Sequence, residues 1–297
     1  MKYGILNLFK PVGPTSRDCV NKLLKPLWPS KVAHAGTLDP LAQGVLLILV
    51  GPAVRLMDEI HELDKEYVAT FSLGQRSPSG DLETECEPVP LSSAMGSDAI
   101  QEVLGRFRGW IDQVPPAFSA IRVDGKRAHK AARRGTEVQM PARRIAIHDL
   151  ELLDCNLPVI RLRIRCSTGT YIRTLGSDVA KSLGTDAVMT ELTRVRVGPF
   201  GVGTARSLES ICEVGAVDRF VEPATAALSH WERWIVDDFV MRRILDGQRL
   251  PAEEVLSTTS SRLAVMDTRH ILRAILKKLP DNTWRCEKGI AHWNVFP

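Results

Sequence analysis

Asp39 is an acidic residue in a stretch dense in turn-forming residues, HAGTLDPLAQG, which covers positions 34–44. An isolated aspartate on a glycine- and proline-rich loop is usually a turn former or a helix cap. Glycosidase chemistry needs a second carboxylate, and a metal site needs converging ligands, and neither can be read from this stretch. The role that one carboxylate can fill alone is covalent nucleophile, which requires a nearby cation to keep it ionised.

Arg173 is a candidate for that cation. It stands in STGTYIRTLGSDVA, where a predicted strand gives way to a predicted helix, and Tyr171 lies two residues before it. Tyr67, in DKEYVATFSLG, begins another predicted strand. The simpler interpretation makes Arg173 a surface arginine whose stem covers the sheet, and Tyr67 an ordinary strand aromatic. These residues alone leave both interpretations open.

Basic residues gather between positions 122 and 144. Eight of them face only Asp124 and Glu137, so the stretch carries a net charge of +6 in a chain whose net charge is +4. The simpler interpretation is a solvent-exposed helix face. The functional interpretation is a contact surface for a phosphate backbone. The basic residues are Arg122, Lys126, Arg127, Lys130, Arg133, Arg134, Arg143 and Arg144.

The elements that must position these residues alternate without a regular βαβ rhythm, which predicts an α+β fold with an antiparallel or mixed sheet. The apolar run 45–50, directly after the Asp39 loop, predicts a buried strand. In the run 159–166, arginines at 161, 163 and 165 share one face of a predicted strand. Further strands are expected at the N-terminus and over 66–74, helices after an N-cap at Ser16, over 97–109 and over 176–184, and an exposed loop over 75–90.

The chain has 297 residues, 44% of them hydrophobic and 25% charged, which favours one large and one small domain. The composition shifts near 225–235, and the remaining residues read as a small β-rich domain. The six cysteines form no CxxC pair, so we expect free thiols in a reducing compartment. The N-terminus lacks an apolar segment of signal-peptide length, and the run 45–50 is too short to cross a bilayer, so we expect a cytoplasmic protein.

Six stretches, taken in order, resemble the TruB family of tRNA pseudouridine synthases. The first resembles that family's Lys-Pro-x-Gly-x-(Ser/Thr)-Ser turn, and the second resembles its catalytic motif. The resemblance runs from about residue 3 to about residue 210, and the tail from about 230 resembles a PUA-type RNA-binding domain only loosely. The stretches are LFKPVGPTS, HAGTLDPLAQGVLLILVG, DKEYVATFSLG, QVPPAFSAIRVDGKRAHKAARRG, CSTGTYIRTLGSDVAKSLG and ELTRVRVGPF.

The resemblance implies a pseudouridine synthase fold over residues 1–228, α+β with a central mixed or antiparallel sheet, and a divergent PUA-like RNA-binding domain over 229–297. It implies an isomerase, a tRNA pseudouridine(55) synthase, that flips uridine 55 out of the T arm of tRNA and converts it to pseudouridine. It implies no cofactor and no metal. The expected partner is the T stem-loop of tRNA, with no membrane and no obligate protein partner, and we expect a monomer.

The resemblance also implies roles for single residues. Asp39 would be the nucleophile, acting either at C6 of the base or at the ribose. Tyr67 would stack on the flipped uracil and assist the late deprotonation at C5. Arg173 would pair with Asp39 and keep it ionised. These three are the expected catalytic residues.

The expected substrate-binding residues follow from the same resemblance. Leu192 would line the base pocket, and His34 would fill the space that the flipped base leaves in the T loop. Lys10, with Pro11, would support the catalytic loop, and Tyr171 is counted with the substrate contacts. A further group would hold the T-arm backbone with its positive charge. That group is Lys126, Arg127, Lys130, Arg133 and Arg134.

Two stretches depart from the family pattern. Ser77-Pro78-Ser79-Gly80-Asp81 stands where the family usually has Thr-Asp-Thr-x-Asp, and His129 stands where a tyrosine is more common. Related enzymes that act through a guide RNA share the core motifs. Two other classes of function are an RNA-binding protein without catalysis and a metal-dependent nuclease or phosphatase. The first has no need for the set Asp39, Tyr67 and Arg173, and the second predicts that a chelator abolishes activity.

Overall fold

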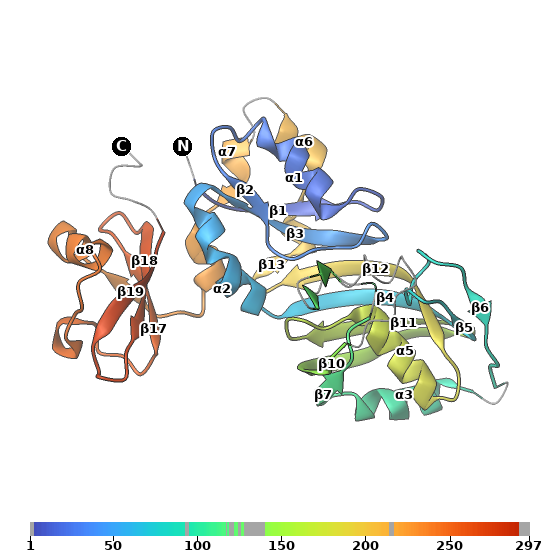
Figure 1. Ribbon diagram of the computed structural model, residues 1–297. Coiled ribbons are helices and arrows are strands. Elements are labelled where there is room, and N and C mark those ends of the chain that lie inside the picture. The colour runs from blue at the N-terminus through green and yellow to red at the C-terminus, as the bar shows by residue number, and fades with distance from the viewer. Residues whose placement is uncertain are drawn as a thin grey trace.

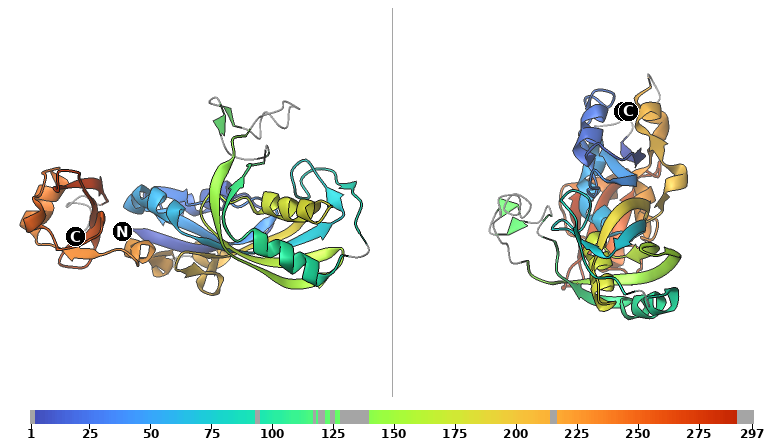
Figure 2. Two further views of the ribbon diagram at one scale, coloured as in Figure 1. Left: turned by 90° about the horizontal axis from the view of Figure 1, so that it is seen from below. Right: turned by 90° about the vertical axis from the view of Figure 1, so that its right-hand side faces the viewer.

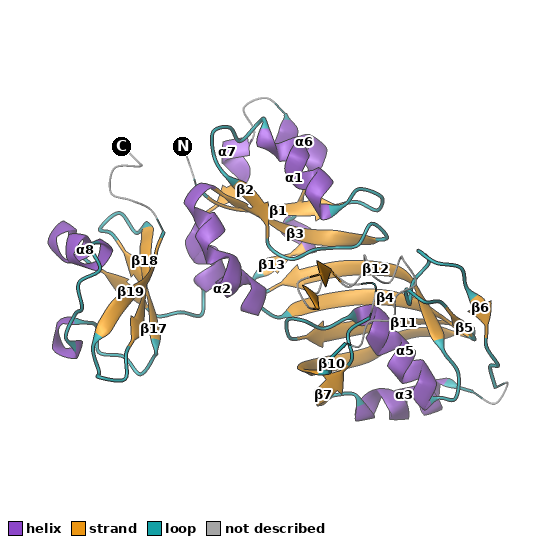
Figure 3. Cartoon of the chain, viewed as in Figure 1, coloured by secondary structure: helices purple, strands orange, loops and turns teal. Residues whose placement is uncertain are grey.

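The computed structural model describes residues 3–92, 95–116, 118, 122–123, 126–127, 140–213 and 217–290. Its strands form a large mixed sheet and a small four-stranded sheet, which lie next to each other in Figure 1. Helices flank the large sheet, and a single helix label accompanies the small one in Figure 3. The expected α+β fold with a mixed sheet is confirmed.

The large sheet has the strand order β14–β1–β3–β12–β4–β11–β10–β7, with β2, β13 and β15 paired to strands on this path. Most neighbours are antiparallel, whereas β1 with β14 and β3 with β12 are parallel. The strands are β1 (Gly4–Lys10), β2 (Val32–His34), β3 (Ala42–Val50), β4 (Lys65–Leu73), β7 (Gly109–Gln113), β10 (Arg143–Asn156), β11 (Val159–Cys166), β12 (Ala187–Val197), β13 (Phe200–Gly201), β14 (Arg206–Ser207) and β15 (Val221–Glu222). Two separate pairs are β5 (Gln75–Arg76) with β6 (Glu87–Pro88), and β8 (Arg122–Val123) with β9 (Lys126–Arg127).

β3 and β11 show how burial differs across the large sheet. Alternate residues of β3 enter two apolar clusters, one on each face, so the strand is buried on both sides as expected. β11 alternates instead, with Ile160, Leu162 and Ile164 buried and the intervening arginines exposed, which confirms the prediction of a one-sided strand. Both faces of the sheet are therefore buried at β3, whereas one face is exposed to solvent at β11.

The helices cover the apolar faces. α3 and α5 pack over β10, β12 and β4, and α1 and α6 lie beside β1. Figure 1 shows α2 between the large sheet and the small one. The helices are α1 (Ser16–Leu24), α2 (Met57–Glu62), α3 (Ser97–Arg106), α5 (Ile172–Ser182), α6 (Leu208–Cys212), α7 (Val217–Phe220) and α8 (Asp238–Leu245), with 3-10 turns over Gly51–Leu56, Val202–Thr204, Ala224–Leu228 and Ala252–Glu254.

The start of α1 differs from the prediction by one residue. Thr15, not Ser16, is the N-cap, because a capping box forms in which the Asp18 amide donates to the Thr15 hydroxyl and the Thr15 amide donates to the Asp18 carboxylate. Ser16 is thereby free to bond elsewhere. Leu24, the last residue of the helix, is 47% exposed.

α5 begins four residues earlier than expected, at Ile172 rather than at Gly176. This shift matters because it places Arg173 in the first turn of the helix instead of at the end of a strand. The helix stops just before Gly184, whose φ of 79° is the left-handed conformation common after a helix C-terminus.

The small sheet has the order β16–β17–β18–β19, and α8 packs against it. Its own apolar cluster is built around Trp284, which is 2% exposed. The expected β-rich tail is confirmed, and the boundary at 228/229 stays a prediction. The strands are β16 (Arg233–Ile235), β17 (Arg262–Met266), β18 (Leu272–Lys278) and β19 (Trp284–Gly289).

The two sheets share an apolar cluster and several polar bridges. Leu272, Ile275 and Ile290 from the tail belong to the same buried cluster as the outer face of β3. Lys288 Nζ lies 2.8 Å from Asp58 Oδ2 and 2.9 Å from Glu59 Oε1 of α2. The Tyr3 hydroxyl donates to the Leu272 carbonyl, and Arg55 donates to Gly289. The tail is thus joined to the large sheet by a continuous interior.

All six cysteines are free thiols, as the sequence indicated. Within the described ranges, every helix falls short of the length and apolarity that crossing a bilayer requires.

Candidate active site

Asp39 lies on the loop between β2 and β3, and α1 holds this loop from one side. The Ser16 hydroxyl accepts from the Leu38 amide at 2.9 Å and donates to the Leu38 carbonyl at 3.1 Å. The Gly13 amide donates to the Pro40 carbonyl at 2.9 Å. These bonds flank Asp39 on both sides, so its backbone is fixed independently of its side chain.

Lys10 and Arg194 hold the same loop from below. The Lys10 ammonium is fully buried and donates to the carbonyls of Ala42, at 2.7 Å, and Pro11, at 2.8 Å. Arg194 donates to Gly36 at 3.1 Å and to Thr37 at 3.4 Å. Burial lowers the pKa of Lys10, although Cys19 and the Asp39 charge raise it. Lys10 was counted with the substrate contacts, but its buried ammonium lies under the loop, in the supporting position.

Gly44 allows β3 and β12 to approach closely next to this loop. A Cβ atom at Gly44 would lie 2.2 Å from the Arg194 carbonyl oxygen, and its φ is 106°. Both facts exclude a side chain there. The close packing of β3 against β12 therefore requires a glycine at position 44, the last residue of HAGTLDPLAQG.

Arg173 reaches the Asp39 carboxylate from α5. Its Nη2 lies 3.3 Å from Asp39 Oδ2, and its side chain is only 7% exposed, against 41% for that of Asp39. The interpretation of Arg173 as a surface arginine is therefore wrong. The structure brings together the two residues that the sequence resemblance paired.

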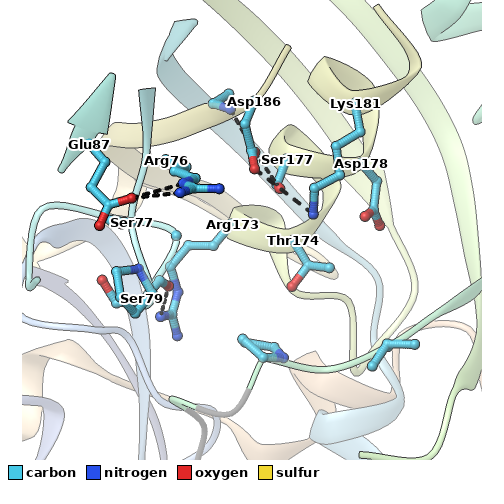
Figure 4. Close-up of a pocket in the computed structure, with 15 residues that line it drawn as sticks. Arg76, Ser77, Ser79, Glu87, Arg173, Thr174, Ser177, Asp178, Lys181 and Asp186 are labelled. Atoms are coloured by element: carbon cyan, nitrogen blue, oxygen red, sulfur yellow. Dashed lines mark hydrogen bonds and ion pairs between the residues drawn. The ribbon is translucent and has the colours of Figure 1, made fainter. Parts of the chain in front are cut away.

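Ser79 and Asp81 complete the surroundings of Arg173, and sequence reasoning missed both. Arg173 Nη1 donates to the Ser79 carbonyl at 2.7 Å and lies 3.4 Å from Asp81 Oδ2, while Nη2 donates to the Phe118 carbonyl at 3.0 Å. Figure 4 shows Arg173 extending from its helix toward Ser79. Ser79 and Asp81 are buried, so the prediction of an exposed loop over 75–90 is wrong at these positions.

The electrostatics of Asp39 combine two opposed effects. Burial raises the pKa of its carboxyl above the ordinary value, and the Arg173 charge pulls it back only in part. A carboxylate with a raised pKa is more basic, and hence a better nucleophile, than a fully stabilised one. Arg173 opposes its neutralisation. Burial and the Arg173 charge therefore act on the pKa of Asp39 in opposite directions.

Tyr67 and Leu192 lie next to the Asp39 loop on neighbouring strands. Leu192 of β12 is 7% exposed and is in register with Ala42 on one side and Ala69 on the other. Tyr67 lies on β4 and is half-buried. Burial raises the pKa of its phenol, while the charge of Arg194 and a hydrogen bond from it act in the opposite direction. An aromatic ring and an apolar side chain therefore lie beside the carboxylate loop.

His34 and Tyr171 occupy the edges of this region. His34 ends β2, and burial, together with the charges of Arg17 and Arg194, lowers the pKa of its imidazole, so it is neutral at pH 7. Tyr171 precedes α5, and its backbone amide donates to Gln113 Oε1 at 2.8 Å. Gln113 returns a bond to the Tyr171 carbonyl at 3.1 Å.

The predicted T-arm contacts fall mostly outside this region. Lys126 and Arg127 form β9, which stands away from the large sheet in Figure 2. Lys130, Arg133 and Arg134 lie outside the described residues. The contact surface for the RNA backbone therefore stays a prediction.

A cavity of about 500 Å³ adjoins Arg173 on α5. Its lining includes Arg76, Ser79 and Asp186 but not Asp39, so Arg173 contributes to this cavity as well as to the carboxylate pair. Two ion pairs lie within its lining, Arg76 with Glu87 at 2.8 Å and Lys181 with Asp186 at 4.0 Å. Among the described residues, no three histidine, cysteine or acidic side chains gather as metal ligands.

Comparison with known proteins identifies the family of this chain. Residues 24–172 match the profile described as TruB family pseudouridylate synthase (N terminal domain). The protein called tRNA pseudouridine synthase B from Parabacteroides distasonis is 45% identical over 213 residues, which are 70% of this chain and 91% of that one. Its counterpart from Listeria welshimeri is 35% identical over 297 residues, which are 97% of this chain and 98% of that one.

A solved structure agrees with these relatives. The crystal structure of a Cbf5–Nop10–Gar1 complex contains a chain that is 25% identical, with a TM-score of 0.76 over 97% of this chain and 85% of that one. The fold and the family are those of a pseudouridylate synthase. The chain belongs to the TruB family.

Proposed function

We propose that this protein converts uridine 55 in the T arm of tRNA to pseudouridine, with Asp39 as the nucleophile and without a cofactor. The observation that carries the proposal is the Asp39–Arg173 pair, with Nη2 and Oδ2 3.3 Å apart, beside Tyr67 and Leu192. The family membership of the chain and the names of its relatives support the choice of tRNA as the substrate.

The chemistry is an isomerisation in which every atom of the base is kept. The N1–C1′ bond breaks, the uracil turns, C5 bonds to C1′, the C5 proton leaves and N1 gains a proton. A stacked uridine is inaccessible, so the base must first leave the T loop. Tyr67 and Leu192 would offset the lost stacking, and Tyr67 would assist the late loss of the C5 proton.

Arg173 and the buried environment would have different effects on Asp39. Burial keeps the carboxylate basic, and the guanidinium, fixed by Ser79 and Asp81, keeps it ionised and placed. Sequence and geometry are compatible with attack at C6 of the base and with action at the ribose. Both routes need the same ionised oxygen.

The positive stretch around β8 and β9 would hold the T-arm backbone. Arg143 and Arg144 at the start of β10 are exposed, and the Arg144 guanidinium lies 5.8 Å from the centroid of the exposed Trp110 ring. An RNA-binding surface of this kind releases counterions on binding. Affinity for tRNA should therefore fall steeply with added salt, and a flat salt dependence would rule this surface out.

Tritium release from tRNA labelled at C5 of uridine tests the proposal, because the label leaves when C5 bonds to C1′. The purified chain should release tritium in the presence of a chelator, and Asp39→Asn should bind tRNA yet release none. A tRNA with cytidine at position 55 should also release none. Release from that tRNA would move the modified position, and no release from wild type would overturn the activity.

The same assay separates a stand-alone enzyme from one that needs partners. The solved relative is part of a complex with Nop10 and Gar1. We propose that this chain acts alone, as a monomer in the cytoplasm. Its similarity to the protein called tRNA pseudouridine synthase B from Listeria welshimeri, over 97% of this chain and 98% of that one, supports this choice. Turnover that appeared only after a second RNA or protein was added would contradict this placement.

A further inference from the structure

Arg194 is a buried arginine that binds backbone carbonyls. It lies on β12 and is 2% exposed. Its Nε donates to the Val45 carbonyl at 2.8 Å, and its two terminal nitrogens donate to Gly36 and Thr37. In the described part of the chain, no carboxylate forms an ion pair with it. A buried guanidinium without a counter-charge is costly, and here the backbone carbonyls of the aspartate loop and of β3 offset that cost.

The strand register places Arg194 between the two halves of the candidate active site. On one side Arg194 is the direct cross-strand partner of Tyr67 in β4. On the other side it is in register with Gly44 of β3, the strand that begins after the Asp39 loop. A side chain at this position can therefore reach both the aspartate loop and the tyrosine.

The side chain of Arg194 bonds the aspartate loop, and the residue is paired with Tyr67. Its three carbonyl bonds go to the turn before Asp39 and to the first half of β3. Arg194 and Tyr67 stand directly opposite each other on neighbouring strands, where paired side chains are close enough to interact. Because the guanidinium is planar and rigid, all of these bonds constrain one another.

We propose that Arg194 is a positioning residue that couples the Asp39 loop to the Tyr67 strand, so that carboxylate and phenol face the same uracil. This inference rests on the proposed function. Arg194 differs from Arg173 because it bonds the loop backbone rather than the reacting carboxylate. It acts on both residues at once, whereas Arg173 acts on Asp39 alone.

Steady-state kinetics with three variants provide the first test. Arg194→Lys keeps the positive charge but loses the planar guanidinium with its several N–H donors, and Arg194→Met removes both. Arg196→Met is the matched control. Arg196 lies two residues further on β12 with a side chain 56% exposed, where it pairs with Glu66. We expect kcat to fall about 10-fold for Arg194→Lys and about 100-fold for Arg194→Met at nearly unchanged KM, as misplacement of reacting groups does.

The control variant should keep kcat and KM within about twofold, as an exposed ion pair contributes little. A folded Arg194→Lys enzyme with the kcat of wild type would overturn the proposal. An equal loss in Arg196→Met would also overturn it, because a general weakening of β12 would then explain both.

5-Fluorouridine in place of the target uridine tests the coupling itself. Fluorine at C5 leaves no C5 proton to be removed, so cleavage of N1–C1′ and formation of C5–C1′ proceed without the deprotonation that Tyr67 assists. If Arg194 positions both residues, Arg194→Lys slows the rearrangement of 5-fluorouridine as well as that of uridine. A loss confined to uridine would reduce the role of Arg194 to the tyrosine and overturn the coupling.

Amide hydrogen exchange over residues 35–42 gives a readout that needs no activity. We expect faster exchange there in both Arg194 variants, with unchanged exchange in β10 and β11 and an unchanged pattern in Arg196→Met. Unchanged exchange over 35–42 would overturn the proposal. An inactive wild-type enzyme would overturn the proposed function instead, and the exchange data would still decide whether Arg194 holds the loop.

Discussion

The buried arginine of the candidate active site and the buried arginine of the small sheet each pair with an aspartate, but the two aspartates are treated differently. Arg173 lies 3.3 Å from Asp39, whose side chain is 41% exposed. Arg273 lies 2.8 Å from Asp267, whose side chain is 4% exposed. The residue types are the same, so the surroundings must set the difference.

The number of donors around each carboxylate makes that difference. Asp267 accepts from the amides of Arg269, at 3.0 Å, and Ile271, at 2.9 Å, as well as from Arg273. Burial alone would raise the pKa of Asp267, but these donors outweigh it and hold the pKa below the ordinary value. For Asp39 burial prevails, and its pKa is raised. A carboxylate whose oxygens all accept hydrogen bonds stabilises the fold, whereas one with few donors keeps lone pairs free to react.

Replacing each aspartate by asparagine should separate the two roles most widely. Asp39→Asn should lower turnover by at least about a thousandfold, because the nucleophile is lost. Asp267→Asn should keep turnover but lower the free energy of unfolding by about 3 kcal/mol or more, since a buried arginine loses its counter-charge. Tritium release and denaturant unfolding measure the two effects. Similar losses of activity in both variants would end the distinction.

Replacing the active-site arginine should produce the next largest effect. A lysine at position 173 cannot reach Asp39, Asp81 and the Ser79 carbonyl together, so turnover should fall about 10- to 100-fold. Arg173→Gln also removes the charge that lowers the pKa of Asp39, so the acid limb of the rate should move to higher pH. Rates measured between pH 5 and pH 9 test this. An acid limb in the wild-type position would argue against the pair.

The pH dependence of stability should differ in sign between the two carboxyls. The lowered pKa of Asp267 contributes stability above the ordinary value of 3.8, and this is lost as the pH falls through the folded value. The raised pKa of Asp39 favours the fold when the carboxyl is protonated, and this is lost as the pH rises above 3.8. Asp39→Asn should therefore unfold at a higher temperature than wild type at pH 7, with the gap closing toward pH 4. A lower unfolding temperature at pH 7 would contradict the sign.

Arg273→Lys should show the smallest effect on catalysis. Turnover should stay within about twofold of wild type, because Arg273 touches no reacting group. The unfolding temperature should fall by a few degrees, since lysine replaces two bonds to Asp267 with one. Calorimetry alongside the tritium assay checks both expectations, and a turnover loss as large as that of Arg173→Lys would undo the contrast.

Local pattern was enough to predict the elements, because their signals are local. The run 45–50 and the alternation in 159–166 identified β3 and β11, and the motif around Asp39 identified the loop. Contacts between residues far apart in the sequence could not be predicted from such local patterns. The composition of 75–90 is that of an exposed loop, yet the buried Arg173 draws the Ser79 carbonyl and Asp81 inward.

The two arginines at the end of β12 show the same limit. In ELTRVRV the two positions look equivalent, because both alternate with apolar residues. Arg194 is buried under the aspartate loop, whereas Arg196 lies in solvent beside Glu66. A register irregularity against β4 falls between them, and nothing in the local sequence marks it.

The continuous interior between the two sheets has a consequence for any long substrate. The apolar cluster and the bridges from Lys288 to α2 leave the tail no hinge about which to swing. An RNA that touches both the Asp39 loop and the small sheet therefore meets a fixed span. Any bending needed for such an RNA to fit would then fall to the RNA and not to the protein.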